Sequence, residues 1–361
     1  MGRSLKGLFR SAVGSSEADN LRVRGTRDLA RRIGFIRPEN VELTKGSTRR
    51  VVSFFNPALK VDSKGLVEIH GRAIAGYYKY VSMIARVELS LEDLTSGACR
   101  ACESRLKAEP EIFPGGWIDF WGAEDPRFTK VEDKEVIVYT GRTLAYYSQT
   151  NIGNTFPVVA VRNNGSWSKK GYITLKPDEA PLAVSIKNSF ILEHKMDKLA
   201  FLRVHDVSGR FHLLVSKIDG IPERDGITPI VVGETWRVID PAPFEEKVGW
   251  ASPVVGYSGE GILVLLHGVD TEMQVYRAFA MIIDIEGEDL VVRSVTPTYI
   301  MEPKTVEEIY GDRPYTVFPC GSWLVDNEIL VSYGSADTAA GLAFIPLSDL
   351  MDLLDKGSTG Y

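Results

Sequence analysis

The chain is dominated by short runs in which apolar and polar residues alternate with a period of two. Runs of this kind, rich in Val, Ile, Tyr and Phe, are typical of β-strands. Turn residues separate them, as at Asp62–Gly65 and Ser208-Gly209. The pattern predicts strands at Arg50–Phe55, Leu66–Ile74, Val81–Leu89, Phe128–Lys130, Val136–Gly141, Val158–Val161, Ala200–His205, Phe211–Ser216, Gly261–His267, Tyr276–Ile285, Leu290–Ser294, Gly321–Val325, Glu328–Tyr333 and Leu342–Pro346.

Helical periodicity is nearly absent before Ser348–Lys356, so we expect an all-β fold with a short C-terminal helix. So many strands must be arranged without exposed edges, as in a closed barrel, a sandwich or a propeller. At 361 residues, a propeller of four-stranded blades fits best, although the repeat does not show the number of blades. No linker interrupts residues 51–361, which we expect to form one domain.

Residues 1–50 differ from the rest because they are charged and irregular. We expect an N-terminal arm with one short helix at about Thr26–Ile33. The basic stretch Arg22–Arg32 is best explained as a solvated face rather than as a nucleic-acid site.

Composition narrows the class of protein. With 44% hydrophobic and 25% charged residues, the chain is globular rather than disordered. Its formal net charge of −6 argues against a nucleic-acid partner. No apolar run reaches the ~18 residues of a membrane span, and the first residues lack the apolar core of a signal peptide. We therefore expect no membrane partner and a cytoplasmic location.

The chain has three cysteines, and two of them, Cys99 and Cys102, form a lone CxxC. No second pair and no histidine follow at zinc-ligand spacing, so we expect no metal site and no redox role. An odd cysteine count fits a reducing compartment. The pair is interpreted as a chance occurrence at the start of a helix.

Polar motifs recur at the ends of the predicted strands. Each alone has a structural explanation, such as an Asp that caps a turn before Pro. In a propeller, however, the ends of the inner strands face one axial channel. The motifs are Phe55–Ala58, Gly122–Arg127, Lys247–Gly249 with Ser252-Pro253, Leu265–Asp270, Tyr276–Asp284, Tyr310–Asp312 with Val317–Gly321, and Tyr333–Thr338.

In this order and spacing, the motifs resemble glycoside hydrolase family 130, which contains inverting β-mannoside phosphorylases and related β-mannosidases. The resemblance runs from about Val51 to Leu347 and implies a five-bladed β-propeller with an axial active site. It also implies that Asp125 is the catalytic proton donor, whose proton is thought to pass through a sugar hydroxyl.

The resemblance assigns further roles around this acid. Lys247, His267 and Tyr276 are expected to bind phosphate. Inorganic phosphate would be a co-substrate, and no organic cofactor is expected. Phosphate attacks directly, so a phosphorylase needs a cationic cradle instead of a catalytic base. Asp337, Asn56 and Arg72 are expected to contact or support the mannosyl unit.

The chain departs from the family pattern at three places. Phosphorylases usually carry Arg-Asn where this chain has Lys187-Asn188, and lysine lacks the bidentate fork of arginine. Arg203 matches a family arginine only with a one-residue shift, which would turn a strand residue to the other face. Lys79 stands in for a basic residue in the first blade. We expect Lys187, Asn188 and Arg203 to bind phosphate and Lys79 to bind substrate.

The function expected is inverting phosphorolysis of β-mannosides or β-manno-oligosaccharides to α-mannose-1-phosphate. An inverting β-mannosidase would instead need a catalytic base. The nearby glutamates, none of them inside a family motif, are Glu245, Glu246, Glu260 and Glu272. A non-catalytic carbohydrate-binding propeller and a glycosidase of the arabinanase or fructosidase type are also compatible with an all-β chain. The expected partners are a mannoside and phosphate, with homo-oligomers formed through the N-terminal arm.

Overall fold

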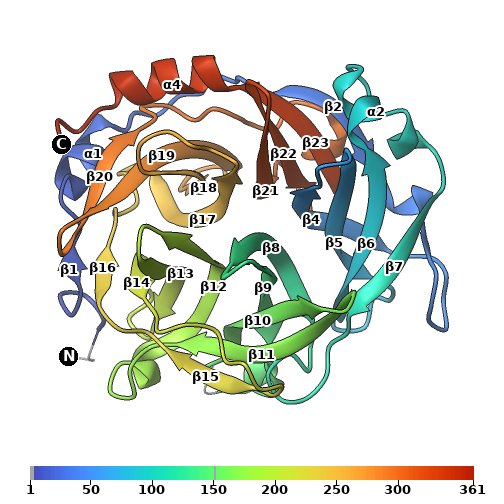
Figure 1. Ribbon diagram of the computed structural model, residues 1–361, viewed down its shortest axis with the longest axis horizontal. Coiled ribbons are helices and arrows are strands. Elements are labelled where there is room, and N and C mark those ends of the chain that lie inside the picture. The colour runs from blue at the N-terminus through green and yellow to red at the C-terminus, as the bar shows by residue number, and fades with distance from the viewer. Residues whose placement is uncertain (1–3, 150–151) are drawn as a thin grey trace.

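The computed structural model describes residues 4–149 and 152–361. These residues form five antiparallel units of four strands, arranged in a ring around a central axis (Figure 1). In each unit the first strand lies nearest the axis and its partners follow outward. The prediction of an all-β fold is therefore confirmed.

Four of the units take their strands in chain order, and only the third of these skips a strand, β15 (Thr228–Val231). The first contains β4 (Ser53–Val61), β5 (Leu66–Ile74), β6 (Ser82–Ser90) and β7 (Leu106–Ile112). The second contains β8 (Ala123–Val131), β9 (Lys134–Arg142), β10 (Thr155–Asn163) and β11 (Ser166–Thr174). The third contains β12 (Ala183–His194), β13 (Asp197–Asp206), β14 (Phe211–Lys217) and β16 (Thr235–Arg237). The fourth contains β17 (Glu245–Val255), β18 (Ile262–Asp270), β19 (Tyr276–Glu286) and β20 (Asp289–Val295).

The fifth unit joins the two ends of the chain. Its inner strands are β21 (Val317–Val325), β22 (Glu328–Ser335) and β23 (Ala339–Pro346), and its outermost strand is β2 (Arg31–Ile36). β2 runs antiparallel to β23, with Gly34 opposite Leu342. The segment expected as a separate arm thus contributes a strand to the ring.

The prediction of a helix at Thr26–Ile33 is wrong. Among residues 4–50 the α-helix is α1 (Ser15–Leu21), and Ile33 and Ile36 of β2 are buried in the core. Pairing with β23 overrides the local preference, because its hydrogen bonds and the burial of both isoleucines are available only in the extended form.

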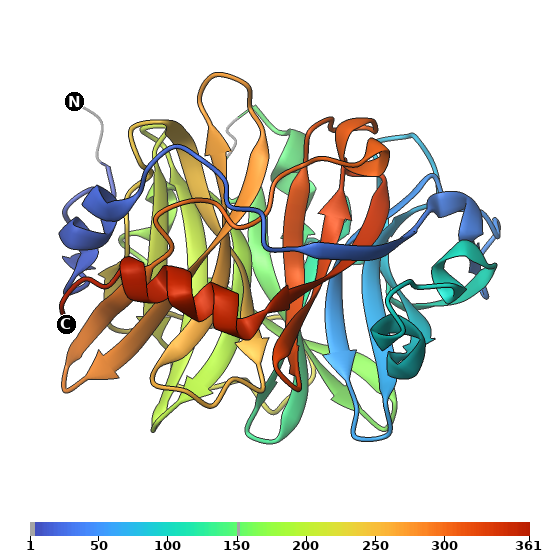
Figure 2. The ribbon, with the colours of Figure 1, turned by 90° about the horizontal axis from the view of Figure 1, so that it is seen from above.

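Other strands and α-helices lie outside these five units. They are β1 (Arg10–Ser11), β3 (Val41–Leu43), β15 (Thr228–Val231), α2 (Leu91–Thr95), α3 (Val306–Ile309) and α4 (Leu347–Lys356). The C-terminal helix expected at Ser348–Lys356 is confirmed as α4, which lies along the outside of the ring (Figure 2). Its leucines at 350, 353 and 354 are buried. No helix in the described ranges is long and apolar enough to cross a membrane.

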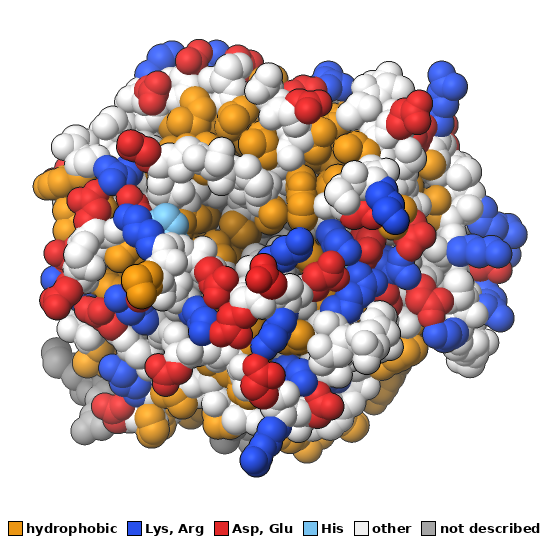
Figure 3. All heavy atoms as spheres, in the orientation of Figure 1, with side chains coloured by type: hydrophobic (Ala, Val, Ile, Leu, Met, Phe, Trp, Pro, Cys, Tyr) orange, Lys and Arg blue, Asp and Glu red, His pale blue; other side chains and the backbone are white. Residues whose placement is uncertain are grey.

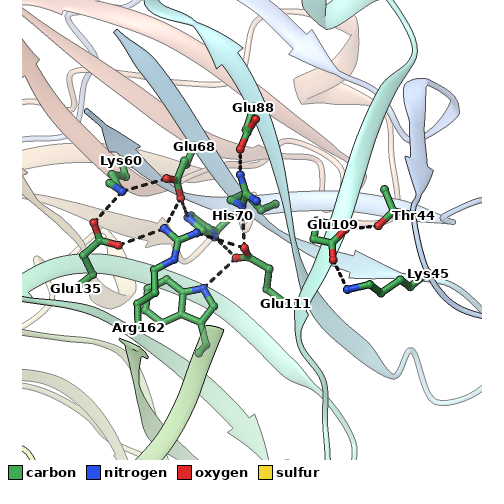
Figure 4. A network of polar contacts seen from close by, with 12 residues as sticks. Thr44, Lys45, Lys60, Glu68, His70, Glu88, Glu109, Glu111, Glu135 and Arg162 are labelled. Atoms are coloured by element: carbon green, nitrogen blue, oxygen red, sulfur yellow. Dashed lines mark hydrogen bonds and ion pairs between the residues drawn. The ribbon is translucent and has the colours of Figure 1, made fainter. Parts of the chain in front are cut away.

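Neighbouring units are held together by aromatic packing at one junction and by charges at another. Between the third and fourth units, Phe201 stacks on Phe190 at 4.3 Å and meets Trp250 edge-on at 5.0 Å. Between the first and second units, Arg162 of β10 donates to Glu68 of β5 at 2.8 Å within a polar network (Figure 4). Both junctions fix the relative positions of the inner strands, which carry the site described below.

Cys99 and Cys102 are joined by a disulfide, which corrects the interpretation of this pair as a chance occurrence. Both residues are buried against Gly34, where an added Cβ would lie 2.8 Å from the Cys99 Cβ. The odd cysteine count is therefore no guide to the compartment, because the bond joins residues three positions apart and leaves Cys320 as the free thiol.

Candidate active site

Three inner strands carry a polar residue at the same kind of irregularity. The strand register shifts between Phe55 and Ala58 in β4, between Glu124 and Arg127 in β8, and between Lys187 and Phe190 in β12. Each bulge holds a residue at positive φ: Asn56 at 47°, Asp125 at 51° and Asn188 at 52°. Asn and Asp tolerate this conformation better than other residues with a Cβ, and a bulge redirects a side chain.

These bulges open onto a polar cavity of about 170 Å³ at the amino ends of the inner strands. Figure 3 shows the opposite face of the ring, where the inner strands reach their carboxyl ends, and this face too is hollowed at the axis. Eight of the residues predicted for the site line the cavity together. The full lining is Asn56, Arg72, Glu124, Asp125, Lys187, Asn188, Arg203, Tyr276, Arg313, Thr316, Phe318 and Asp337.

One side of the cavity, which we call the acid half, consists of Asn56, Arg72, Glu124 and Asp125. Asn56 Nδ2 donates to Asp125 Oδ1 at 2.8 Å, and Arg72 Nη1 donates to the same oxygen at 3.3 Å. Arg72 Nη2 also donates to Glu124 Oε1 at 2.6 Å. Gly334 makes room for Asn56, because a Cβ there would lie 1.6 Å from Asn56 Oδ1. The acid half is therefore held rigidly by its own contacts.

Two of the three carboxyls that line the cavity, Asp125 and Asp337, differ in acidity. Burial alone would raise the pKa of Asp125, but the charges of Arg72 and Arg127 outweigh it and hold that pKa below its usual value. Burial raises the pKa of Asp337 to about 7, and the negative charge of Asp125 adds to this effect while Arg72 opposes it. Without substrate, Asp125 is therefore ionised and Asp337 is near its titration midpoint at neutral pH.

The other side, which we call the cationic half, consists of the lining residues Arg203, Tyr276 and Arg313, together with Lys247, which lies beside them but outside the lining. The Arg313 guanidinium lies 4.6 Å from the centre of the Tyr276 ring, and Lys247 Nζ lies 5.9 Å from it. Burial lowers the pKa of Lys247, and the charge of Arg203 lowers it further. Within residues 4–149 and 152–361, no carboxylate lies within ion-pair distance of Arg203 or Arg313, and Nε of each is buried without a partner.

His267 lies behind this wall rather than in the lining. Its ring is fully buried, 4.5 Å from Phe318 and 5.7 Å from Tyr276. Burial, with Arg203 adding, lowers the pKa of His267 well below its usual value, so the imidazole is neutral. An added Cβ at Gly249 would lie 2.5 Å from His267 Nε2, so this glycine is needed for the ring to fit.

Lys79, which was expected to bind substrate, does not line the cavity. Its Nζ lies 4.0 Å from the centre of the Tyr147 ring, and its carbonyl accepts from Arg142 Nη1 at 3.1 Å. Arg142 in turn lies 3.4 Å from Glu124. Lys79 thus lies beside Tyr147, and Arg142 connects it to Glu124 of the acid half.

None of the four glutamates considered as a hydrolytic base lines the cavity. Glu245 is buried in an ion pair with Arg22 at 2.7 Å, and Glu272 pairs with Arg24 at 2.8 Å. Glu246 lies 3.5 Å from Lys247 but is partly exposed, and Glu260 is exposed.

Four lining residues were given no role from the sequence: Glu124, Arg313, Thr316 and Phe318. Two of them are charged. Glu124 belongs to the same sequence motif as Asp125, so the sequence shows that it is close to the expected acid. The sequence does not show its hydrogen bond with Arg72. Arg313 follows Tyr310–Asp312, a motif noted in the sequence, yet no local pattern shows that it reaches Tyr276.

A polar cavity that sets a carboxyl against fixed cations is suited to an enzyme that moves a sugar onto an anion or onto water. The chain belongs to glycoside hydrolase family 130, because the model of this family, described as beta-1,4-mannooligosaccharide phosphorylase, matches residues 20–356. The resemblance seen in the motifs is thereby confirmed.

Individual relatives agree with this family. A 1,2-beta-oligomannan phosphorylase of Thermoanaerobacter sp. is 26% identical over 82% of this chain and 90% of the relative. A beta-1,2-mannobiose phosphorylase of the same organism is 28% identical over 62% of this chain and 67% of the relative. Among solved structures, the beta-1,2-mannobiose phosphorylase of Listeria innocua superposes with a TM-score of 0.67 at 17% identity, covering 89% of this chain and 96% of that one.

A further solved structure is one of the glycoside hydrolases of this family that target beta-1,2 mannosidic linkages in Candida mannan. It superposes with a TM-score of 0.62 at 18% identity, covering 87% of this chain and 94% of that one. Similarity at this level shows the shared fold, and the family contains both phosphorylases and hydrolases.

Proposed function

We propose that the protein is an inverting β-mannoside phosphorylase whose five units are the blades of a five-bladed propeller. The proposal rests mainly on the cationic half. Arg203, Lys247 and Arg313 lie around Tyr276, and two of them lack a carboxylate partner in the described structure. Buried cations that are not neutralised by the protein favour an anionic ligand. Family membership and the names of the relatives point to phosphate as that anion.

The chemistry divides between the two halves. An oxygen of phosphate attacks C1 of the mannosyl unit, and the bond between C1 and the leaving oxygen breaks. The leaving oxygen receives a proton that originates on the carboxyl of Asp125, directly or through a sugar hydroxyl. Attack from the face opposite the leaving group inverts C1 and yields α-mannose-1-phosphate together with the shortened mannoside.

Asp125 must carry a proton to act as the acid, although Arg72 and Arg127 keep it ionised in the absence of substrate. A phosphate dianion between the two halves supplies negative charge that offsets these cations. A nearby negative charge raises the pKa of a carboxyl. Phosphate binding is thus expected to favour protonation of Asp125 when the attacking group is in place.

Asn56, Arg72 and Asp337 are the proposed contacts or supports of the mannosyl unit. Asn56 Oδ1 is buried without a partner and is free to accept from a sugar hydroxyl. Lys79, beside Tyr147, is proposed to meet a sugar farther from the bond that is cleaved. A cytoplasmic location, homo-oligomers and the absence of an organic cofactor stay predictions.

The proposal is tested by supplying β-1,2- and β-1,4-linked mannobiose with and without phosphate. The expected result is α-mannose-1-phosphate from at least one substrate in phosphate, and no appreciable cleavage without it. Cleavage to free mannose at full rate in phosphate-free buffer would instead identify an inverting β-mannosidase. Binding of mannobiose without any cleavage would identify a carbohydrate-binding propeller.

A further inference from the structure

The cationic half contains a cation that was given no role from the sequence, Arg313. From the sequence, Lys187, Arg203, Lys247 and His267 are expected at the phosphate. Lys187 Nζ, however, lies 3.5 Å from Glu124 Oε2 and 5.8 Å from the centre of the Tyr146 ring. It is therefore drawn to the acid half, where a carboxylate already offsets its charge. Arg313 instead lies on the Tyr276 ring, 4.6 Å from its centre.

The position of Arg313 is fixed by the backbone on both sides of the cavity. Its N–H donates to the carbonyl of Ala336 at 3.0 Å, next to Asp337. Gly311 allows this approach, because an added Cβ there would lie 2.4 Å from the Ala336 oxygen. On the other side, the Tyr276 N–H donates to the carbonyl of Tyr315 at 3.2 Å. The loop therefore holds Arg313 between Tyr276 and Asp337.

The surroundings of Arg313 match those expected for a ligand contact. Its guanidinium has no ion pair within the described part of the chain, and its buried Nε has no hydrogen-bond partner. The charges of Arg313 and Arg203 both disfavour the charged form of Lys247. Arg203 and Arg313 face the cavity, and Lys247 lies beside them. These mutually repelling cations are stabilised when an anion binds among them.

We propose that Arg313 is a phosphate-binding residue of this enzyme, and that it acts with Arg203 and Lys247 as the positively charged contact that Lys187, paired with Glu124, does not make. This inference rests on the proposed phosphorolysis. It assigns to the loop between α3 and β21 a part in setting affinity for phosphate, while the acid half sets the position of the sugar.

The inference is tested by comparing Arg313→Gln and Arg313→Lys with wild-type enzyme in steady-state phosphorolysis. Arg313→Gln is expected to raise KM for phosphate roughly 10-fold or more, because a charge-assisted hydrogen bond is lost. KM for the mannoside should change less than about twofold. Arg313→Lys should recover part of the affinity, since charge remains but the fork is lost. Arg224→Gln, at an exposed position outside the cavity, is the matched control.

A second readout does not depend on turnover. Inorganic phosphate should raise the Tm of the wild-type protein by binding the folded state, and Arg313→Gln should reduce that increase. A phosphate-dependent wild-type enzyme with unchanged phosphate KM in Arg313→Gln would overturn the role of Arg313 alone. A rise confined to the mannoside KM would also overturn it, by making Arg313 a sugar contact. Wild-type cleavage that needs no phosphate would instead overturn the proposed function itself.

Discussion

The two halves of the cavity solve the problem of burying charge in opposite ways. In the acid half, Arg72 bonds to both Glu124 and Asp125, and Asn56 adds a further donor. In the cationic half, Arg203 and Arg313 lack a carboxylate within the described residues. The acid half is complete without ligand, whereas the cationic half becomes complete only when an anion arrives. The acid half thus stabilises the structure of the site, whereas the cationic half provides affinity for an anionic ligand.

This difference has an energetic consequence. Breaking a satisfied buried ion pair leaves an uncompensated charge, whereas removing a cation that repels its neighbours relieves strain. Natural proteins accept such local conflicts at functional sites. The same type of residue, arginine, should therefore have opposite effects on stability in the two halves.

The largest expected effect is on the acid. Asp125→Asn keeps the shape of the side chain but cannot donate the proton that the leaving oxygen needs. We expect turnover to fall by roughly 10²- to 10⁴-fold. Release of α-mannose-1-phosphate measures this, with the Tm as a control for folding. Turnover near the wild-type rate would remove Asp125 from the catalytic role.

The second prediction contrasts two arginines. Arg72→Met leaves Glu124 and Asp125 without their shared partner, so the free energy of unfolding should fall by about 3–5 kcal/mol. Arg203→Met removes a cation near Arg127 and Lys247 and should leave stability unchanged or raise it. Denaturant unfolding of both variants at neutral pH measures the difference. Equal destabilisation of the two would abolish the distinction between the halves.

The third prediction concerns affinity for the anion. Lys247→Ala removes one of the three cations around Tyr276, so KM for phosphate should rise roughly 10- to 100-fold. Binding of the mannoside should be nearly unchanged, because the acid half is untouched. Steady-state kinetics with each substrate varied separately measures both constants. A larger effect on the mannoside than on phosphate would place the anion elsewhere.

The smallest effect is expected at Asp337. Its pKa rises from 3.8 to about 7 on folding, so between these values the folded state holds a proton that the unfolded chain has lost. Wild-type stability should therefore fall as pH rises through this window. Asp337→Asn removes the titration, so its Tm relative to wild type should be a few degrees higher at about pH 8 than at about pH 5. A constant difference would show that Asp337 is ionised throughout.

The sequence identified the parts of the site that depend on local chemistry. Asn56 and Asp125 each precede a proline in an inner strand, and their positive φ suits Asn and Asp. The residues next to them in the sequence are therefore enough to recognise them, whatever the position of the strand in the fold. The all-β fold and α4 were likewise predictable, because both follow from the spacing of apolar residues.

Features that depend on distant partners were missed or misplaced. Arg313 reaches Tyr276 because its loop docks on Ala336, which no short-range pattern encodes. The contact of the Lys79 side chain with Tyr147 was likewise not visible in the sequence, and the role of Lys79 at the substrate stays a prediction. The helix expected at Thr26–Ile33 failed for the same reason, since the partner of β2 is the last strand of the chain.

That late partner also constrains how the protein is made. β2 emerges early during synthesis, but β23 emerges roughly 300 residues later, which at about 5–20 residues per second takes roughly 15–60 s. Throughout that time the apolar face of β2 has no strand to pair with, although the first units can already assemble. The ring therefore closes only after β23 has been made, and until then the nascent N-terminal segment needs protection from other strand edges.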